Sequence, residues 1–374
     1  MSTYTDALAG VIEDVVEPQA GAVDQRQRFP SDAIKGLGQA GILGLASSAE
    51  VGGGGEGLRA AGEVIEALAA ACGSTAMVVL MHLAAVVAIE AHGPDGVRRE
   101  IAAGRHLSTL AFSEVGSRSH FWAPRSTAAM AVDDVVLNAR KSWVTSAAEA
   151  DSYVWSSRPL AAPGPMTLWL VPSGTPGLSH PGTFDGLGLR GNGSIPVNAD
   201  DVPVPLSAML GGDGAGLDIA LAAVLPWFLI LSGSFAVGLM EAVTAETGRH
   251  VTGTRLDHLG QALIDQPITR ADYARMRLAT DTTRAFVADA ISAVESGRPD
   301  ATLRVLEVKA VAAESAIAVA DLAMKICGGA AFRKELGVER RFRDARAARV
   351  MAPTTDALLD FVGRAIAGLP LLDA

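Results

Sequence analysis

Two long segments without a charged residue constrain the fold of this chain most strongly. Residues 67–89 and 219–240 contain no Asp, Glu, Lys or Arg, and each is long enough to cross a bilayer as a helix. The first carries His82, Pro226 interrupts the second, and neither has the flanking positive cluster that sets membrane topology. Helices that are apolar all round also form the centre of large bundles. We therefore expect two buried central helices and no membrane insertion.

The pattern of apolar residues divides the 374 residues into three regions. Residues 1–105 have helical periodicity, residues 106–216 contain short β-type runs separated by Pro and Gly, and residues 217–374 are helical again. Helices followed by strands and then by long helices predict an α+β fold, because a parallel α/β sheet would need the two kinds of element to alternate. We expect one domain for each region.

The expected elements follow from periodicity and from Pro and Gly at their ends. Helices are predicted at 60–72, 75–92, 217–249, 267–296, 301–327 and 353–367, and strands at 107–113, 128–138 (as a hairpin), 153–157 and 166–171.

Composition excludes several classes of function. Hydrophobic residues make up 49% of the chain and charged residues 19%, so it can bury a large core. A net charge of −10 argues against nucleic-acid binding. The arginines between Arg340 and Arg349 are interpreted as a solvated or ion-paired helix face. The N-terminus lacks the features of a signal peptide, which predicts a cytoplasmic protein.

Several common site motifs are absent or misplaced. Cys72 and Cys327 lie among small and apolar residues, so buried inert thiols are expected and a disulfide framework is not. The glycines of 51–57 fit a dinucleotide-binding spacing, but no strand precedes them, and we interpret the segment as a flexible loop. There is no metal-ligand spacing, P-loop or nucleophile elbow.

Five short segments carry the most specific patterns, and they follow one another along nearly the whole chain. They are Leu110-Ala-Phe-Ser-Glu-Val-Gly-Ser-Arg-Ser119, Leu137-Asn-Ala-Arg-Lys-Ser-Trp-Val-Thr-Ser146, Arg255 with Gln266, Lys325-Ile-Cys-Gly-Gly329, and Glu339-Arg-Arg-Phe-Arg-Asp-Ala-Arg346. In this order and spacing they resemble the acyl-CoA dehydrogenase family. The resemblance implies an N-terminal helical domain, a middle β-barrel-like domain and a C-terminal four-helix bundle, with FAD bound between the last two. It also implies a homo-oligomer, most often a tetramer, in which a neighbouring subunit completes each FAD site.

The first two segments supply flavin contacts by this resemblance. Phe112 is expected to contact the flavin through its backbone, and Ser113 and Ser119 through their hydroxyls, with Arg118 standing where the family has glycine. Trp143 is expected to pack on the flavin and Thr145 to bond near its N5.

The later segments supply the remaining contacts. Arg255 and Gln266 resemble the pair that holds the diphosphate and adenosine of the adjacent subunit, and a guanidinium suits paired phosphate oxygens. Gly328 and Gly329 would let FAD approach the backbone, and Lys325 replaces the glutamine of the family motif. Thr354 keeps the threonine that contacts the flavin edge.

The catalytic glutamate of the family is missing. Counting from the Arg343-Asp-Ala-Arg346 run places Ala352 at its position. Some relatives carry the base on the first long helix of the last domain, where Phe228 and Leu229 stand here. The carboxylates Asp218 and Glu241 lie about two to three helical turns away on either side. The catalytic residue therefore remains open.

Three functions follow from this pattern. The first is an FAD-dependent oxidoreductase that acts on an acyl thioester or a related small substrate, with its base elsewhere. The second is a flavin monooxygenase on the same fold, in which His82 or His120, beside Ser119, assists the oxygen chemistry. The third is a non-oxidative or non-catalytic relative that binds acyl-CoA. The redox partner would be an electron-transfer flavoprotein in the first case and a flavin reductase in the second.

Overall fold

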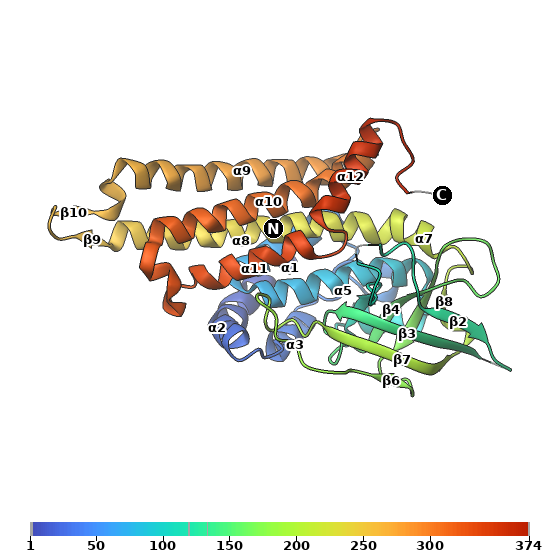
Figure 1. Cartoon of the computed structure of the whole chain (residues 1–374). Helices are drawn as coiled ribbons and strands as arrows, with labels where there is room; N and C mark the ends of the chain where they lie inside the picture. The colour runs from blue at the N-terminus through green and yellow to red at the C-terminus, as the bar shows by residue number, and fades with distance from the viewer. Residues whose placement is uncertain (1–2, 119, 133, 373–374) are drawn as a thin grey trace. The chain divides into compact units, whose positions relative to one another are not determined.

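The structure is a computed structural model that describes residues 3–118, 120–132 and 134–372 (Figure 1). The chain forms two compact units. The first consists of Met1–Val64, Met77–Asp185 and Arg190–Phe228, and the second of Ile65–Ala76, Gly186–Leu189 and Leu229–Ala374.

The N-terminal region is helical, as predicted. Its elements are α1 (Thr3–Val11), the π-helical turn η1 (Ile12–Val16), α2 (Glu17–Gln25), α3 (Ser31–Gln39), the 3-10 turn η2 (Ala49–Val51), α4 (Leu58–Ala71), α5 (Gly73–His92) and α6 (Asp95–Ala102). Pro30 is the residue before α3, and Pro94 the residue before α6. Proline just before or at the first helical position is tolerated because the first amide of a helix has no partner within it.

The two uncharged segments are long helices. They form α5 and the stretch made by α7 (Gly216–Ile219), the π-helical turn η4 (Ala220–Val224) and α8 (Leu225–Gly253). Both are long and apolar enough to span a membrane by length and composition alone. However, 78% of the most apolar window of the first and 61% of that of the second are buried in the fold. This burial is typical of core helices, in agreement with the expectation.

The glycine-rich loop at 51–57 owes its glycines to close packing. A Cβ on Gly53 would lie 2.3 Å from the carbonyl oxygen of Ser47, and one on Gly54 would lie 2.7 Å from that of Leu45. The segment is a loop, as predicted. Its glycines serve tight backbone approach, so the expectation of flexibility has no support from the packing.

The middle region forms two four-stranded sheets. The strands are β1 (Ser108–Ala111), β2 (Thr127–Met130), β3 (Val135–Val144), β4 (Ser152–Ser157), β5 (Thr167–Pro172), β6 (Leu178–Ser179), β7 (Ile195–Val204) and β8 (Met209–Leu210). One sheet has the order β1-β4-β5-β8 and the other β2-β3-β7-β6. All pairs are antiparallel except β1 with β4. The predicted strands and the β2–β3 hairpin are confirmed.

One hydrophobic core joins the two sheets. Tyr153, Trp155 and Trp169 from one sheet are fully buried with Leu137 and Val197 from the other. Large aromatic side chains bury much apolar area, so this cluster stabilises the pair of sheets.

The C-terminal region is a set of long helices, which Figure 1 shows lying side by side. After α8 come α9 (Pro267–Glu295), α10 (Ala301–Cys327), α11 (Val338–Val350) and α12 (Thr355–Ile366). The short hairpin β9 (Arg255–Leu256) and β10 (Gln261–Ala262) connects α8 to α9 through the 3-10 turn η5 (Leu263–Asp265). Two further 3-10 turns, η6 (Gly328–Phe332) and η7 (Lys334–Leu336), connect α10 to α11.

The arginine run lies on α11, and Arg341, Arg343, Arg346 and Arg349 form ion pairs within the fold. Arg341 bonds Glu246 at 2.7 Å, Arg343 bonds Glu339 at 2.7 Å, and Arg346 pairs with Asp321. Arg349 pairs with Glu314. The interpretation of an ion-paired helix face is confirmed. Cys72 and Cys327 are buried free thiols, also as expected.

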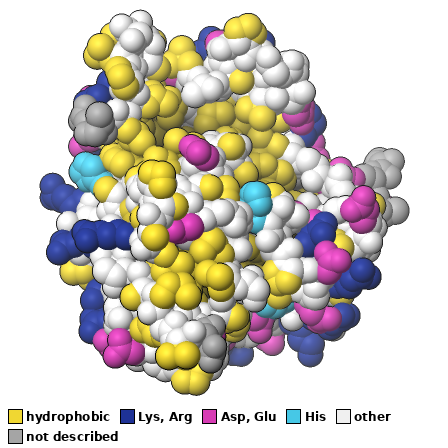
Figure 2. Space-filling model, turned by 90° about the vertical axis from the view of Figure 1, so that its right-hand side faces the viewer, with side chains coloured by type: hydrophobic (Ala, Val, Ile, Leu, Met, Phe, Trp, Pro, Cys, Tyr) yellow, Lys and Arg dark blue, Asp and Glu magenta, His cyan; other side chains and the backbone are white. Residues whose placement is uncertain are grey.

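Large hydrophobic side chains remain exposed on the single chain. Figure 2 shows one face with many hydrophobic side chains across its middle and most of the Lys and Arg toward its margins. The most exposed are Val132, Phe332, Val350, Trp143 and Ile366. Exposed apolar surface of this kind is typical of sites that bind a ligand or another protein.

Candidate active site

The structure brings two of the predicted site segments together. The amide of Ser142 donates to the carbonyl of Ser113 at 2.9 Å, and the amide of Val115 donates to the carbonyl of Arg140 at 3.1 Å. The segment that follows β1 therefore runs antiparallel beside β3. As a result Ser113 lies next to the residue that precedes Trp143, and both segments contribute to one surface of the β region.

Trp143 is held in an unusual way. Its φ is 56°, a left-handed conformation that bulky residues rarely adopt, and the pairing of β3 with β7 shifts register between Lys141 and Val144. Its side chain is 70% exposed. The left-handed backbone conformation costs free energy, and the exposed indole gains no burial within the chain to offset that cost. Such a residue is typical of a surface that a flat ligand covers.

Thr145 lies at the end of the same bulge. It is buried, and its hydroxyl is 3.0 Å from that of Ser194. The amide of Ser146 donates to the carbonyl of Asn192 at 2.9 Å, which fixes this turn against residues 192–194. Phe112 and Ser113 are half-buried at the end of β1.

The loop after Ser113 carries the remaining candidates of the β region. Arg118 is exposed and has a φ of 49°, where the family motif has glycine, the residue that adopts this conformation freely. Ser119 lies outside the described residues. His120 is exposed, its Nδ1 lies 3.1 Å from the carbonyl of Ser117, and its ring packs edge-on against Trp122.

A buried ion pair under this loop was not anticipated from the sequence. The Lys141 ammonium lies 2.6 Å from Glu114, and both side chains are almost completely buried. Glu114 also accepts from the amides of Arg125 and Ser126 and from the Ser126 hydroxyl. Burial lowers the pKa of Lys141 to about 8, even though Glu114 favours its charged form. The pair fastens both ends of the loop 114–126 to β3.

His82 is a core histidine in this structure. Its ring is fully buried, its Nε2 lies 2.9 Å from the carbonyl of Leu43, and its Nδ1 accepts from the amide of Ser108 at 3.0 Å. Burial lowers its pKa to about 4, so the ring is neutral near pH 7. Because both nitrogens are engaged, the candidate role of His82 in oxygen chemistry has no structural support.

In the second unit, Arg255 and Gln266 lie at the two ends of the segment that connects α8 to α9. Arg255 is exposed on β9, donates only to the carbonyl of Gly260 at 3.3 Å, and has no carboxylate within ion-pair distance among the described residues. Gln266 bonds the Gln261 side chain. The guanidinium of Arg255 is therefore available to an anion.

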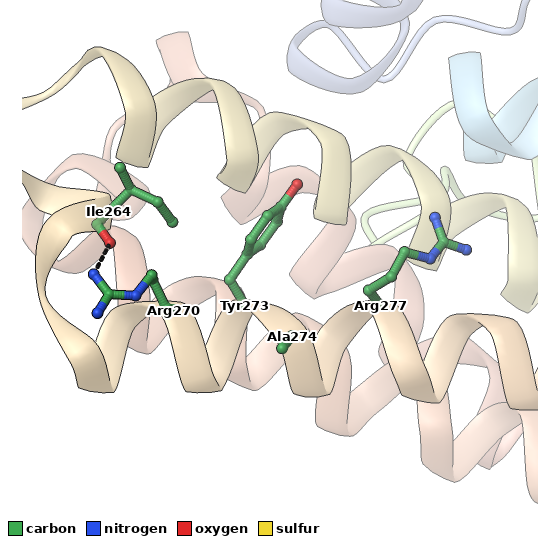
Figure 3. A pocket seen from close by; sticks show the side chains of 5 residues that line it. All are labelled: Ile264, Arg270, Tyr273, Ala274 and Arg277. Atoms are coloured by element: carbon green, nitrogen blue, oxygen red, sulfur yellow. Dashed lines mark hydrogen bonds between the residues drawn. The ribbon is translucent and has the colours of Figure 1, made fainter.

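A shallow hollow lies beside this segment (Figure 3). It has a volume of about 500 Å³ and is lined by Ile264, Arg270, Tyr273, Ala274 and Arg277. Arg270 donates to the carbonyls of Ile264 and Asp265, so its position is set by the backbone of η5. Tyr273 extends from α9 to pack on Gly248 of α8, where an added Cβ would lie 2.3 Å from its hydroxyl.

The glycines after α10 face open space. Gly328 has φ 55° and ψ −135°, which only glycine adopts readily, and a Cβ on it would meet nothing within 4 Å. Gly329 has ordinary backbone angles and is equally open. Packing among the described residues therefore gives no reason for the glycine at 329, and the open space leaves its backbone accessible.

Lys325 has a partner within the bundle. Its ammonium lies 2.7 Å from Asp272, which also pairs with Arg275. The substitution of lysine for the family glutamine is thus matched by an acid on α9. Lys325 keeps 62% of its side chain exposed, so it can still face an anionic ligand.

The connection between α11 and α12 carries Ala352. Thr354 is the residue before α12, and its hydroxyl accepts from the amide of Ala357 at 3.4 Å. The ammonium of Lys309, buried on α10, donates to the carbonyls of Ala348, Met351 and Pro353. No acid replaces the missing glutamate at position 352 itself.

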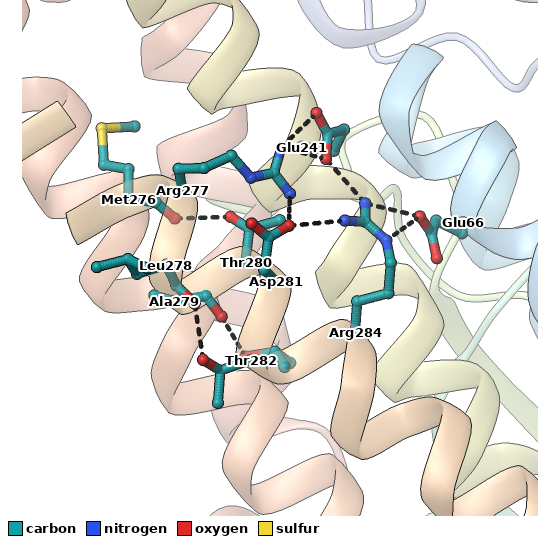
Figure 4. Close-up of polar contacts among 11 residues, drawn as sticks. Glu66, Glu241, Met276, Arg277, Leu278, Ala279, Thr280, Asp281, Thr282 and Arg284 are labelled. Atoms are coloured by element: carbon teal, nitrogen blue, oxygen red, sulfur yellow. Dashed lines mark hydrogen bonds and ion pairs between the residues drawn. The ribbon is translucent and has the colours of Figure 1, made fainter. Parts of the chain in front are cut away.

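The alternative positions for a base also lack one. Phe228 and Leu229 are buried hydrophobic residues, and Asp218 is exposed on α7. Glu241 is held by Arg277 and Arg284 in the network of Figure 4, which also includes Glu66 and Asp281. Burial raises the pKa of Glu241, but the hydrogen bonds from Arg284 and Arg277 outweigh it and lower the net value. A carboxylate in this state is a poor proton acceptor.

These features fit a flavin dinucleotide. Taken by itself, the first unit offers the exposed indole of Trp143. The second, taken by itself, offers open backbone at Gly328 and Gly329 and, at Arg255, a guanidinium with no carboxylate partner among the described residues. An aromatic face suits a flat ring, and a guanidinium suits paired phosphate oxygens.

Comparison with protein-family models covers almost the whole chain. Residues 2–104 match the N-terminal domain of acyl-CoA dehydrogenases, residues 109–202 the middle domain, and residues 214–367 the C-terminal domain.

Individual members of this family are similar to the chain over most of its length. The mitochondrial short-chain specific acyl-CoA dehydrogenase of Bos taurus is 29% identical over 352 residues, which covers 91% of this chain and 83% of the relative. The short-chain specific acyl-CoA dehydrogenase of Clostridium acetobutylicum is 26% identical over 352 residues, covering 92% of each. Among solved structures, butyryl-CoA dehydrogenase from Megasphaera elsdenii superimposes with a TM-score of 0.91 at 22% identity, covering 98% of both chains.

Proposed function

The chain belongs to the acyl-CoA dehydrogenase family and is an FAD-dependent oxidoreductase, and from this premise we propose that it acts on an acyl thioester without the usual glutamate base. The observation that carries the proposal is the paired flavin surface, in which Ser113 is bonded beside β3 and Trp143 stands exposed on its bulge. The fold is that of the family, with an N-terminal helical, a middle β-sheet and a C-terminal helical domain. We place the domain limits at 1–105, 106–216 and 217–374.

We assign the cofactor contacts to two groups of residues. In the first unit they are Phe112, Ser113, Arg118, Ser119, Trp143 and Thr145, and in the second Arg255, Gln266, Lys325, Gly328, Gly329 and Thr354. Bound FAD supplies the hydride acceptor of the reaction. The protein contributes an aromatic surface at Trp143, a fixed hydroxyl pair at Thr145 and Ser194, and positive charge at Arg255.

Removal of the substrate proton is expected to be the slow step of the reaction. Ala352 has no basic group, and the carboxylate of Glu241 is bound by two arginines. A missing general base costs on the order of 10²–10⁴ in rate. Simple saturated acyl-CoA thioesters should therefore reduce the flavin very slowly.

The oxygenase alternative rests on the same missing glutamate. Of its two candidate histidines, His82 is fully bonded in the core, which leaves the exposed His120. The relatives found by comparison are dehydrogenases and give this alternative no support.

The assembly and the cellular setting are further parts of the proposal. By the family resemblance, Arg255 and Gln266 serve the FAD of a neighbouring subunit, so we propose a homo-oligomer, most simply a tetramer. An electron-transfer flavoprotein would reoxidise a dehydrogenase, whereas a flavin reductase would supply an oxygenase. We propose a cytoplasmic location.

The experiment begins with the purified protein and FAD. It should bind one FAD per subunit non-covalently and prefer FAD to FMN, and a protein that ignores added FAD would overturn the whole proposal. Anaerobic mixing with a panel of acyl-CoA thioesters, followed through the flavin absorbance, should then show slow bleaching at most. Rapid bleaching by a saturated acyl-CoA would reveal a base at another residue. A parallel sample with reduced FAD and oxygen tests the oxygenase alternative.

A further inference from the structure

Lys309 is the buried cation that the flavin contacts do not explain. It lies within α10, where its neighbours Val308, Ala310 and Ala312 are buried and apolar, and it is 1% exposed. Burial lowers the pKa of its ammonium to about 7. Among the described residues no carboxylate lies within ion-pair distance of its Nζ. An unpaired buried charge is costly, so a methionine or leucine would suit this core better unless the ammonium has a function.

The ammonium is satisfied entirely by backbone carbonyls of one segment. Nζ lies 2.9 Å from the oxygen of Ala348, 3.0 Å from that of Met351 and 2.9 Å from that of Pro353. An ammonium has three protons to donate, and the segment supplies three acceptors. Two of these carbonyls come directly before and directly after Ala352.

Two other backbone bonds lie at the ends of the segment: the amide of Met351 donates to the carbonyl of Ala347 at 3.0 Å, and the amide of Leu358 donates to that of Thr354 at 3.0 Å. The carbonyl of Ala348 is in the last turn of α11, where helix carbonyls lack intrahelical partners. Thr354 caps α12 at the far end of the connection. Lys309 thus joins the backbone between the two helices directly to α10.

We propose that Lys309 is a positioning residue whose ammonium fixes the backbone of residues 351–353, and so sets where the side chain of residue 352 and Thr354 are presented. We call the three bonds from Lys309 to the carbonyls of Ala348, Met351 and Pro353 the Lys309 clamp; these contacts are present in the structure. The bearing of the Lys309 clamp on the reaction rests on the proposed function, which places this connection at the active site. Lys309 does not act on substrate directly, because it is buried and each of its protons is already donated.

Other charges near α10 are engaged elsewhere. On α9, Asp289 pairs with Arg298, and on α11 Arg346 and Arg349 pair with Asp321 and Glu314. Asp356 of α12 is exposed, and the 3-10 turn η6 has no ionisable side chain. Over the range from pH 6 to pH 9.5, titration of Lys309 is therefore the change expected to affect the segment that connects α11 to α12.

The test compares Lys309→Met, Lys309→Arg and the exposed-lysine control Lys334→Met by hydrogen exchange of the full-length protein with FAD. In Lys309→Met, amides of 349–357 should exchange at least about tenfold faster, whereas α9 keeps its protection. The visible circular dichroism of the bound FAD should change as well. Lys309→Arg should restore part of both signals, and Lys334→Met should match the wild type.

Two results would overturn the proposal. One is unchanged exchange at 349–357, and the other is a uniform increase over the whole bundle, which would make Lys309 an ordinary core residue. If Lys309→Met does not fold, a pH series on the wild type decides. A neutral amine has only two protons to donate, so exchange at 349–357, corrected for its intrinsic pH dependence, should rise from pH 6 to pH 9.5. A flat profile would refute the clamp. Absence of FAD binding would count against the proposed function alone, since the exchange measurement does not need it.

Discussion

The Lys141 ammonium lies 2.6 Å from the Glu114 carboxylate in the interior of the β region, directly beneath the loop that carries Arg118 and His120. Glu114 binds the far end of this loop through the amides of Arg125 and Ser126. The pair therefore links the core of the β sheets to the loop that the family motif assigns to FAD.

Removing one member of this pair should be strongly destabilising. Lys141→Met or Glu114→Gln leaves an uncompensated buried group, which we expect to cost about 3–5 kcal/mol in the free energy of unfolding. The double variant Lys141→Met/Glu114→Gln should lose much less than the sum of the two single variants. Chemical denaturation of the four proteins measures the coupling, and additive losses would show that the two groups do not interact.

His82 should make stability depend on pH. Its pKa is about 4 in the folded chain against 6.5 for an ordinary histidine, so the unfolded chain binds more protons between these values. The stabilisation is complete above about pH 6.5 and is lost as pH falls toward 4, at a cost of roughly 2–3 kcal/mol. In His82→Gln, which can still donate and accept, this part of the decline should disappear. Urea denaturation at several pH values measures it, with His120→Gln as the exposed control. A wild-type stability that is flat from pH 7 to pH 4 would contradict the prediction.

Ala352→Glu should raise the rate at which simple acyl-CoA thioesters reduce the flavin well above the slow wild-type rate. The new carboxylate would stand at the position of the family base, and a general base contributes on the order of 10²–10⁴ in rate. Anaerobic bleaching of the flavin by short-chain and medium-chain acyl-CoA thioesters measures the gain. Ala352→Gln has nearly the same size without a base and should stay at the wild-type rate. If the glutamate variant binds FAD and is no faster, residue 352 does not face the reacting carbon.

Trp143→Ala and Arg255→Ala should complement each other in mixed oligomers. Each variant alone should bind FAD at least about tenfold more weakly, because each loses one side of the site. If Arg255 serves a neighbour, a mixed pair contains one site with both residues intact, so the co-expressed variants should recover part of the FAD binding. Lys35→Ala, which removes an exposed charge on α3, serves as the control. Recovery no better than the average of the two variants would place both residues in one subunit's site.

The fold was largely predictable because periodicity and family spacing agree. Helix α10 begins and ends at the predicted residues 301 and 327, and the predicted strand at 153–157 differs from β4 by one residue. Strand β7 was missed because Pro196 and Pro203 interrupt its pattern, and proline is unusual within a paired strand. In the structure Pro203 is accommodated next to a register shift in the pairing with β3.

The site was less predictable, because its determinants are contacts between segments far apart in the chain. Lys141 and Glu114 each belong to a recognised motif, yet neither motif indicates that they meet. From the sequence, His82 resembles a functional residue because it lies alone in an apolar helix segment. Only the positions of Leu43 and Ser108 in the structure show that both of its ring nitrogens have hydrogen-bond partners. Lys309 gives a similar signal, a single cation on an apolar face, but the sequence does not indicate which carbonyls it meets.

The Lys309 clamp consists of hydrogen bonds to backbone carbonyls and does not involve the side chain of residue 352. Backbone carbonyls are the same whichever amino acid a gene specifies at that position. Alanine at this position, where the family has glutamate, therefore lacks the reactive group but leaves these backbone contacts available. One substitution at this position can therefore exchange the reactive group while the contacts that hold the backbone stay the same.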